Sequence, residues 1–150
     1  MNTETTQTDE RPAILAKSLG INPEEVNLYG ADHYGLTIFE ADGAEYAIGT
    51  DEEADEAVTE AIKESLWAFK ASFILGCCGL PYELEEAIEA WQQKKCEGCN
   101  DAIEQMIDRT CELDEFVRQA VSSDGRGHFL SQYDGDEIEL GNDLYAFRIN

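Results

Sequence analysis

The stretch TDEEADEAVTEAIKESLW contains four glutamates at four-residue spacing: Glu52, Glu56, Glu60 and Glu64. At this spacing a helix places them in one row, whose successive members rise about 6 Å along the axis. Such carboxylates can imitate the phosphates of a nucleic acid and occupy a phosphate-binding groove on a basic protein. Because B-DNA has one phosphate per ~3.4 Å on each strand, this row alone is too sparse for imitation.

Acidic side chains from other elements would have to extend the row. Glu53 thickens the row near its start, whereas Lys63 interrupts its negative field. Two further acidic clusters supply candidates, one in the next predicted helix and one near the C-terminus. They are Glu83, Glu85, Glu86 and Glu89, and Asp134, Asp136, Glu137, Glu139 and Asp143. The alternative interpretation is a solvated surface, which is the usual role of a run of charges.

The charge balance favours a role for the acids beyond solubility. The chain has 33 acidic and 10 basic residues, a formal net charge of -23 at pH 7. A net charge of about 2–8 in magnitude is enough to keep a small domain soluble. Such a surface repels nucleic acids and anionic membranes and attracts basic proteins, which disfavours direct DNA binding. Adaptation to high salt is a further alternative.

Five cysteines could provide metal or redox chemistry: Cys77, Cys78, Cys96, Cys99 and Cys111. Cys96 and Cys99 form a CxxC motif, but a structural zinc site usually takes two spaced pairs, and the second pair here is adjacent. A thioredoxin-like role lacks the preceding strand. Buried thiols acting as small hydrophobic groups are the simpler interpretation. We therefore expect no metal and no cofactor, with a cysteine-ligated metal protein as an alternative.

Catalytic side chains are scarce. The two histidines, His33 and His128, lie far apart in sequence, outside any hydrolase or metalloprotease motif. The segment DGRGHFLSQYDG could form a small active-site loop in which His128 has the neighbours Asp124, Arg126, Ser131 and Asp134, but no nucleophile is paired with a base there. Gly125 and Gly127 favour a tight structural turn instead. The sequence therefore predicts a protein that is not an enzyme.

One α+β domain over residues 12–150, preceded by a flexible N-terminus at residues 1–11, is expected to position these groups. The runs LTIFE and AEYAIGT flank Asp42-Gly43 and predict a hairpin at about 36–49. The run LYAFRIN predicts a C-terminal strand at about 144–149 that joins the hairpin in a small antiparallel sheet. A strand around 26–29 is also possible. Three or four helices would pack against this sheet.

The helices are predicted from apolar spacing. A short one covers 12–19, and a long one begins after Thr50 with a Thr50–Glu53 capping box and ends near Gly76. The apolar stripe of the long helix lies opposite the glutamate row and comprises Ala54, Val58, Ala61, Ile62, Ser65, Leu66, Phe69 and Phe73.

A second long helix is predicted over 81–95, with an inward face formed by Leu84, Ala87, Ile88 and Trp91. Further helical turns are expected around 102–107 and 113–121. The segment SSDGRGH and much of SQYDGDEIELGND are predicted to be loops.

The segments KESLWAFKASFIL and GRGHFLSQYDGDEIELGNDLYAFRIN resemble a group of small uncharacterised acidic proteins of bacteriophages and mobile elements, over roughly residues 36–150. The resemblance implies a context and transfers no functional residue. Small, very acidic phage proteins often inhibit host defence or DNA-handling proteins, several of them as DNA mimics.

The resulting expectation is a DNA-mimic inhibitor that occupies the nucleic-acid groove of a CRISPR effector or restriction enzyme. A phage accessory protein-binding module whose acidity serves only solubility is the alternative. The start of the chain lacks the features of a signal peptide, and no apolar run approaches the ~18 residues that span a membrane. These features predict a location in the host cytoplasm.

Overall fold

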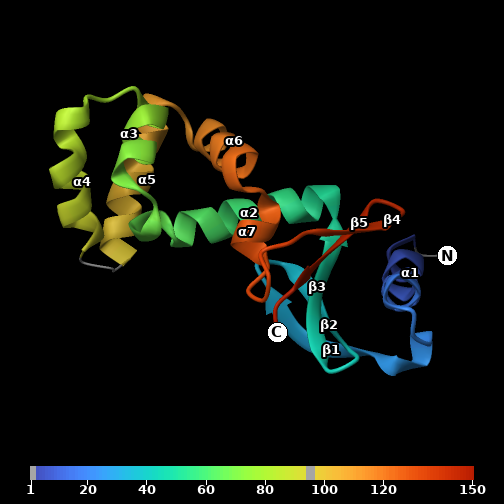
Figure 1. The fold of residues 1–150 in the computed structure, drawn as a ribbon. Helices are drawn as coiled ribbons and strands as arrows, with labels where there is room; N and C mark the ends of the chain where they lie inside the picture. The colour runs from blue at the N-terminus through green and yellow to red at the C-terminus, as the bar shows by residue number, and fades with distance from the viewer. Residues whose placement is uncertain (1–2, 94–96) are drawn as a thin grey trace. The chain divides into compact units, whose positions relative to one another are not determined.

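The computed structural model describes residues 3–93 and 97–150 (Figure 1). Its fold class is α+β, as predicted, with an antiparallel sheet and helices. The chain separates into two compact units, whereas the sequence predicts one domain. The first unit comprises the chain up to Val58 together with Gly125–Asn150, and the second comprises Thr59–Asp124. The first unit is thus built from two separate parts of the sequence.

The first unit contains a five-stranded sheet in the order β1-β2-β3-β5-β4, with neighbouring strands antiparallel. Its strands are β1 (Val26–His33), β2 (Leu36–Ala41), β3 (Ala44–Thr50), β4 (Ile138–Gly141) and β5 (Leu144–Arg148). The predicted hairpin and C-terminal strand are confirmed, and β5 pairs with β3. Strand β4 lies in a segment for which the sequence predicts mostly loop.

Two-residue turns join the hairpins of this sheet. Asp42 and Gly43 have φ angles of 52° and 76°, and Asn142 and Asp143 have φ angles of 54° and 60°. Positive φ at both central residues matches the right-handed twist of paired strands, and Asp and Asn adopt it more readily than most residues. The Asp-Gly signal therefore predicted the β2–β3 turn correctly, and Asp143 has a structural role in the β4–β5 turn.

Helix α1 (Thr3–Leu19), followed by the 3-10 helix η1 (Pro23–Glu25), packs against the sheet. It contacts the edge strands β1 and β4, and its Leu15 and Ala16 are fully buried in a cluster with Phe39 and Ile48. The sequence predicts this helix only from Pro12, because proline favours a first helical turn. The helix instead begins at Thr3 and contains Pro12 in its interior.

Helix α2 (Asp51–Glu64) starts with the predicted capping box, which the hydrogen bonds confirm. The backbone N–H of Thr50 donates to Oε1 of Glu53 at 2.9 Å, and the N–H of Glu53 donates to Oγ1 of Thr50 at 3.2 Å. These two bonds satisfy backbone groups that a helix start otherwise leaves unpaired. Helix α2 begins in the first unit and ends in the second.

The predicted end of this helix near Gly76 is wrong. After Glu64 the chain forms the 3-10 helix η2 (Leu66–Ala68) and then helix α3 (Ala71–Cys78). A side-chain amide that is distant in sequence stabilises the break between α2 and η2. The side chain of Asn100 donates to the carbonyl of Glu64 at 2.9 Å and accepts from the N–H of Trp67 at 3.0 Å. These bonds satisfy backbone groups of the interrupted helix.

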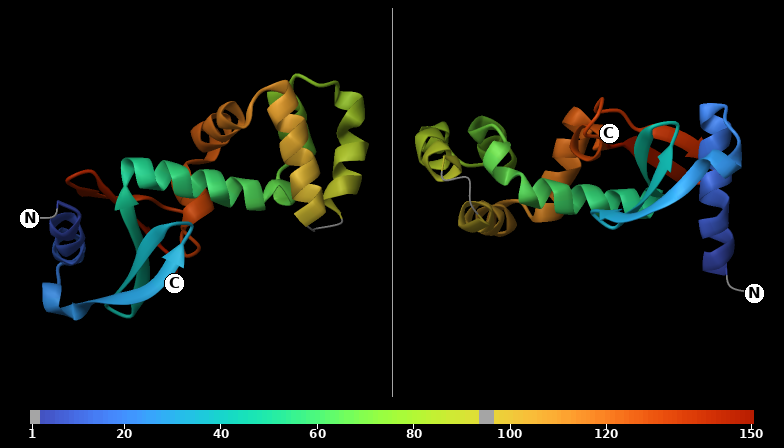
Figure 2. Two further views of the ribbon diagram at one scale, coloured as in Figure 1. Left: turned by 180° about the vertical axis from the view of Figure 1, so that it is seen from behind. Right: turned by 90° about the horizontal axis from the view of Figure 1, so that it is seen from below.

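The rest of the second unit is helical (Figure 2). Its elements are η3 (Tyr82–Leu84), α4 (Glu85–Gln92), α5 (Glu97–Thr110) and α6 (Leu113–Asp124). The core of this unit includes Leu75, Ile103, Ile107 and Phe116, each at most 1% exposed. The predicted inward face of the second long helix is largely wrong, because Ile88 is buried but Leu84, Ala87 and Trp91 are exposed. Its predicted end at Lys95 lies outside the described residues.

The prediction of a loop for SSDGRGH is also wrong. Helix α6 continues to Asp124, and the short helix α7 (Arg126–Leu130) begins two residues later. The connecting residue Gly125 has φ 85° and ψ 154°, a conformation that is essentially restricted to glycine. Among the described residues, no helix has the length and apolar character needed to cross a membrane.

Candidate partner-binding surface

The glutamate row of α2 is solvent-exposed along its whole length, as predicted. All four members, Glu52, Glu56, Glu60 and Glu64, are exposed. The opposite side of α2 is buried, including Ala54, Val58, Ala61 and Ile62. Buried side chains on one face stabilise the helix, so its folding does not need the glutamates. The row therefore presents carboxylates to solvent at a small cost from like-charge repulsion.

Lys63 neutralises part of this row within the second unit. Its Nζ lies 3.6 Å from Oε1 of Glu60 and 3.5 Å from Oε1 of Glu104 in α5. The negative charge of Glu104, followed by that of Glu60, raises the pKa of Lys63. Glu104 thus contributes an acidic group beside the row, and no local sequence pattern predicts this contact between residues 41 positions apart.

Glu53 differs from its neighbours because its carboxylate is bound inside the first unit. In addition to capping α2, Oε1 of Glu53 accepts a hydrogen bond of 2.9 Å from Nη2 of Arg11 in α1. The Arg11 side chain is buried, and its Nη1 donates to the carbonyl of Ile48 at 3.3 Å. The geometry therefore gives Glu53 a structural role that joins α1, β3 and α2.

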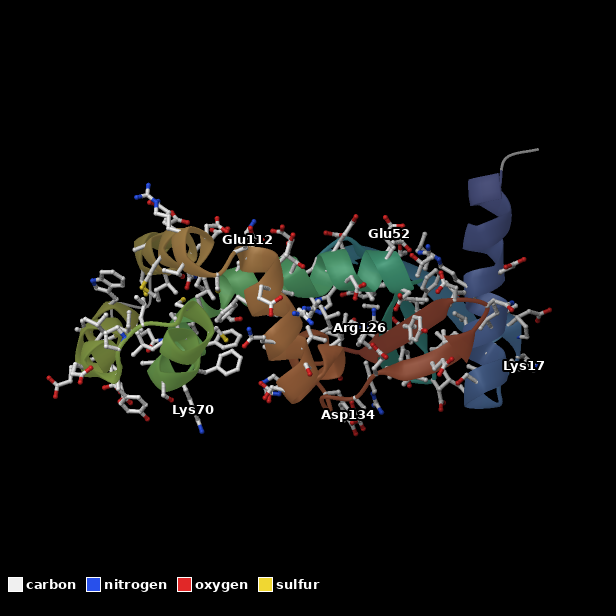
Figure 3. All side chains as sticks on the ribbon, turned by 90° about the horizontal axis from the view of Figure 1, so that it is seen from above. Lys17, Glu52, Lys70, Glu112, Arg126 and Asp134 are labelled. Carbon is white, nitrogen blue, oxygen red and sulfur yellow. The ribbon has the colours of Figure 1, made fainter. Side chains whose placement is uncertain are left out.

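A second arginine, Arg126 of α7, lies at the centre of a carboxylate cluster in the first unit (Figure 3). Its Nε donates to Oε1 of Glu137 at 2.6 Å, and its Nη1 donates to Oδ1 of Asp51 at 2.9 Å and to Oδ1 of Asp55 at 3.0 Å. The guanidinium also lies over the ring of Tyr145, 4.8 Å from its centroid. The side chain of Arg126 is only 9% exposed.

The protonation of Arg126 follows from these contacts. Burial disfavours the charged guanidinium and lowers its pKa. The hydrogen bond and charge of Glu137, together with the hydrogen bonds to Asp51 and Asp55, outweigh the effect of burial. The pKa of Arg126 is therefore raised overall. The cluster contains one cation and three carboxylates, so its net charge beside α2 is negative.

Gly127, which follows Arg126, explains how the cluster is built. A Cβ atom on Gly127 would lie 2.5 Å from the carbonyl oxygen of Gly135 and 2.7 Å from the backbone nitrogen of Glu137. Real Cβ atoms do not approach backbone this closely, so only glycine fits without movement. The 135–137 backbone therefore lies directly against α7, which places Glu137 within reach of Arg126.

All five members of the late acidic cluster are exposed, and Asp134 and Glu137 also bind other groups of the first unit. Asp134 accepts hydrogen bonds from the N–H of Asp136 at 3.0 Å and from Oγ of Ser131 at 2.9 Å. The bond from Asp136, followed by that from Ser131, lowers the pKa of Asp134. Asp136, Glu139 and Asp143 are exposed. In the view of Figure 3, Glu52 and Asp134 lie on opposite sides of Arg126, so Asp134 does not extend the glutamate row.

The remaining predicted acids lie in η3 and α4 of the second unit. Glu83, Glu86 and Glu89 are exposed, and Glu85 is partly buried. They belong to the same unit as Glu60 and Glu64, whereas the late cluster belongs to the first unit. Each unit therefore carries its own set of exposed acids.

Both histidines contact other residues of the first unit. His33 is buried with Nε2 2.8 Å from the carbonyl oxygen of Leu130, and the ring of exposed His128 packs edge-on against Phe129. Across residues 3–93 and 97–150, no group of three or more His, Cys, Asp or Glu side chains could hold a metal ion.

Cys77, Cys78 and Cys111 are free thiols. Cys78 and Cys99 are buried, and Cys77 and Cys111 are partly buried. Burial, followed by the charges of Cys111 and Cys78, raises the pKa of Cys77 to about 11, which favours an unreactive thiol. Cys96, the first residue of the CxxC motif, lies outside the described residues.

Comparisons of this chain with protein-family models, with curated proteins and with solved structures give no match.

Proposed function

We propose that this protein is a non-enzymatic inhibitor that imitates nucleic acid and occupies the nucleic-acid groove of a host defence or DNA-handling protein, such as a CRISPR effector or a restriction enzyme. The observation that carries the proposal is the exposed glutamate row on α2, opposite a buried face that accounts for the folding of the helix. The row is a feature of the surface that the fold does not require.

The placement of the basic residues supports the same function. Arg11, Lys63, Arg118 and Arg126 form ion pairs with acidic side chains of their own unit. These cations therefore do not present an uncompensated positive surface, while the net charge of the chain is -23. The resulting field attracts a basic groove over a distance and speeds association, and its effect weakens as salt increases.

The resemblance to phage and mobile-element proteins supplies the context. In this proposal the protein acts in the cytoplasm of a bacterial host, where the proteins that cleave invading DNA are found. It binds a protein and no nucleic acid, and it needs no cofactor.

A cleavage assay with a panel of Cas9-type nucleases and restriction endonucleases tests the proposal. We expect the protein to inhibit DNA cleavage by at least one of them and to compete with duplex DNA for binding. Inhibition should weaken by about tenfold or more when salt rises from about 0.05 to 0.2 M, because the contacts replace phosphate contacts.

Two double variants of equal charge separate the row from net charge. Glu56→Lys with Glu60→Lys reverses two members of the row, whereas Glu24→Lys with Glu40→Lys changes exposed acids elsewhere. The row variant should lose inhibition by about tenfold or more, and the control should stay within about threefold of the unmodified protein. Equal loss in both variants, or inhibition that does not respond to salt, contradicts the proposal.

A further inference from the structure

The solvent-facing side of η3 and α4 carries large apolar side chains. Tyr82 is 69% exposed, and Leu84 and Trp91 are each 40% exposed. Leu84, Ala87 and Trp91 have the i, i+3, i+7 spacing that places residues on one side of a helix. We call Leu84, Ala87 and Trp91 the α4 stripe. A sequence pattern that normally marks a core-facing side is here open to solvent.

The rotation of α4 is fixed by a hydrogen-bonding side chain together with one buried apolar residue. Gln92 is buried, and its Nε2 donates to the carbonyl of Leu66 at 3.0 Å and to the carbonyl of Phe69 at 2.6 Å. Ile88, one turn earlier, is buried on the same side. A rotation that buried Leu84 and Trp91 would break both bonds and leave buried polar groups unpaired, which is costly.

The net charge of the chain indicates which kind of surface covers the stripe. Glu83, Glu86 and Glu89 are exposed on the same two elements as the stripe. A second copy of this chain would bring like charges together, because every copy has a net charge of -23. A basic surface offers the opposite sign, and its arginines can also stack on the ring of Trp91. Tryptophan and tyrosine are the side chains that most often dominate binding energy in interfaces.

We propose that the α4 stripe is an apolar anchor for a basic surface of a partner protein that also carries exposed apolar side chains. This inference deepens the proposed function and rests on it for the basic character of the partner. The glutamate row supplies long-range attraction, and the stripe supplies short-range apolar contact that holds the complex together.

Two synthetic peptides of equal charge serve as probes. The first is an amphipathic helical peptide of arginine and leucine, and the second has every leucine replaced by serine. Fluorescence anisotropy with labelled peptides at about 0.15 M NaCl gives both dissociation constants. The unmodified protein should bind the leucine peptide about tenfold tighter than the serine peptide, a difference that measures the apolar contact.

Matched leucine variants locate this contact. Leu84→Ser should reduce the preference for the leucine peptide to less than about twofold, whereas Leu28→Ser, at a 65% exposed leucine of β1, should leave it unchanged. Ala87→Lys should also reduce the preference, and because Ala87 is exposed in a helix this variant keeps the core intact. Circular dichroism confirms that each variant is folded.

A spectroscopic readout follows the stripe directly. The chain has two tryptophans, so Trp67→Phe leaves Trp91 as the single reporter. Binding of the leucine peptide should shift its emission to shorter wavelength as the ring leaves water. No shift, or an unchanged peptide preference in Leu84→Ser and Ala87→Lys, overturns the inference.

The results of the peptide experiment and of the nuclease assay distinguish the two proposals. A stripe-dependent peptide preference without inhibition of any nuclease retains the anchor and rejects nucleic-acid mimicry. Inhibition that depends on the glutamate row, together with a peptide preference independent of Leu84, retains the mimicry and rejects the anchor.

Discussion

Arg126 donates a hydrogen bond of 2.6 Å from its Nε to Oε1 of Glu137, and this contact joins α7 to the segment that leads into β4. The other edge of the same guanidinium binds Asp51 and Asp55 of α2. One buried cation therefore holds three carboxylates together in the first unit. Without the cation these carboxylates would repel one another, so the contact stabilises the surface on which α2 presents its acids.

Arg126→Met should lower the free energy of unfolding by about 2–3 kcal/mol, because three carboxylates lose their cation, although their own exposure reduces the effect. Urea denaturation followed by circular dichroism measures this change. The matched control is Arg118→Met, which removes a 75% exposed arginine paired with Glu115 and should leave the stability nearly unchanged, because an exposed ion pair contributes little. If the two variants lower the free energy of unfolding equally, the Arg126 cluster stabilises the protein no more than an exposed ion pair does.

Gly127→Ala should destabilise the protein by about 1–3 kcal/mol, since the new methyl group would overlap the backbone at Gly135 and force a shift. Gly76→Ala is the matched control. Gly76 lies inside α3 with open space around it, so alanine should raise stability by about 0.5–1 kcal/mol. Thermal unfolding of both variants checks the opposite signs, and a stabilised Gly127→Ala protein would contradict the close contact with the 135–137 backbone.

Glu53→Ala should cost about 1–2 kcal/mol in unfolding free energy, because it removes the cap of α2 and the acidic partner of Arg11 together. Glu52→Ala changes an adjacent, exposed glutamate of the same helical turn and should alter stability by less than about 0.5 kcal/mol. Chemical denaturation of the two variants side by side measures the difference. A cost shared equally by both would mean that only the charge of the helix start matters.

Salt should stabilise the unmodified protein. Repulsion between exposed carboxylates is screened as the Debye length falls from about 30 Å at 0.01 M to about 3 Å at 1 M salt. The melting temperature should therefore rise over this range, and the rise should be smaller in Glu52→Gln with Glu56→Gln. Unfolding of the protein at low salt would instead indicate adaptation to a saline environment.

Alkylation of Cys77 should accelerate only at alkaline pH. Its pKa is raised to about 11 from an ordinary value of 9.0, first by burial and then by the charges of Cys111 and Cys78. Because the pKa is raised in the folded state, the protonated thiol contributes to the stability of the fold. This contribution is fully present below pH 9 and is lost as the pH rises through 11. Iodoacetamide labelling with peptide mass spectrometry should give a midpoint near 11 for native Cys77 and near 9 after denaturation. Equal midpoints would contradict this.

Features with local signals could be predicted from the sequence. Asp42-Gly43 between alternating apolar runs predicted the β2–β3 hairpin, and the Thr50–Glu53 spacing predicted the start of α2. The exposure of the glutamate row followed from helical periodicity alone. Each of these features depends on residues within a few positions of one another, where backbone geometry limits the alternatives.

Features that depend on distant side chains could not be predicted. The end of α2 is stabilised by Asn100, 36 residues from Glu64, and the rotation of α4 is fixed by Gln92 through carbonyls 23 and 26 residues away. The Arg126–Asp51 contact spans 75 residues. The glycines around Arg126 predicted a tight turn, but they did not predict which carboxylates the arginine binds.

The first unit is assembled from two segments with Thr59–Asp124 between them, and this has a consequence during synthesis. Strand β3 ends at Thr50, but its neighbour β5 begins at Leu144. While the ribosome is still translating the intervening residues, β3 has only β2 as a partner. The continuous unit Thr59–Asp124 can form its local contacts in that interval, since short-range contacts form before long-range strand pairing. The sheet is completed only after β5 has emerged from the ribosome.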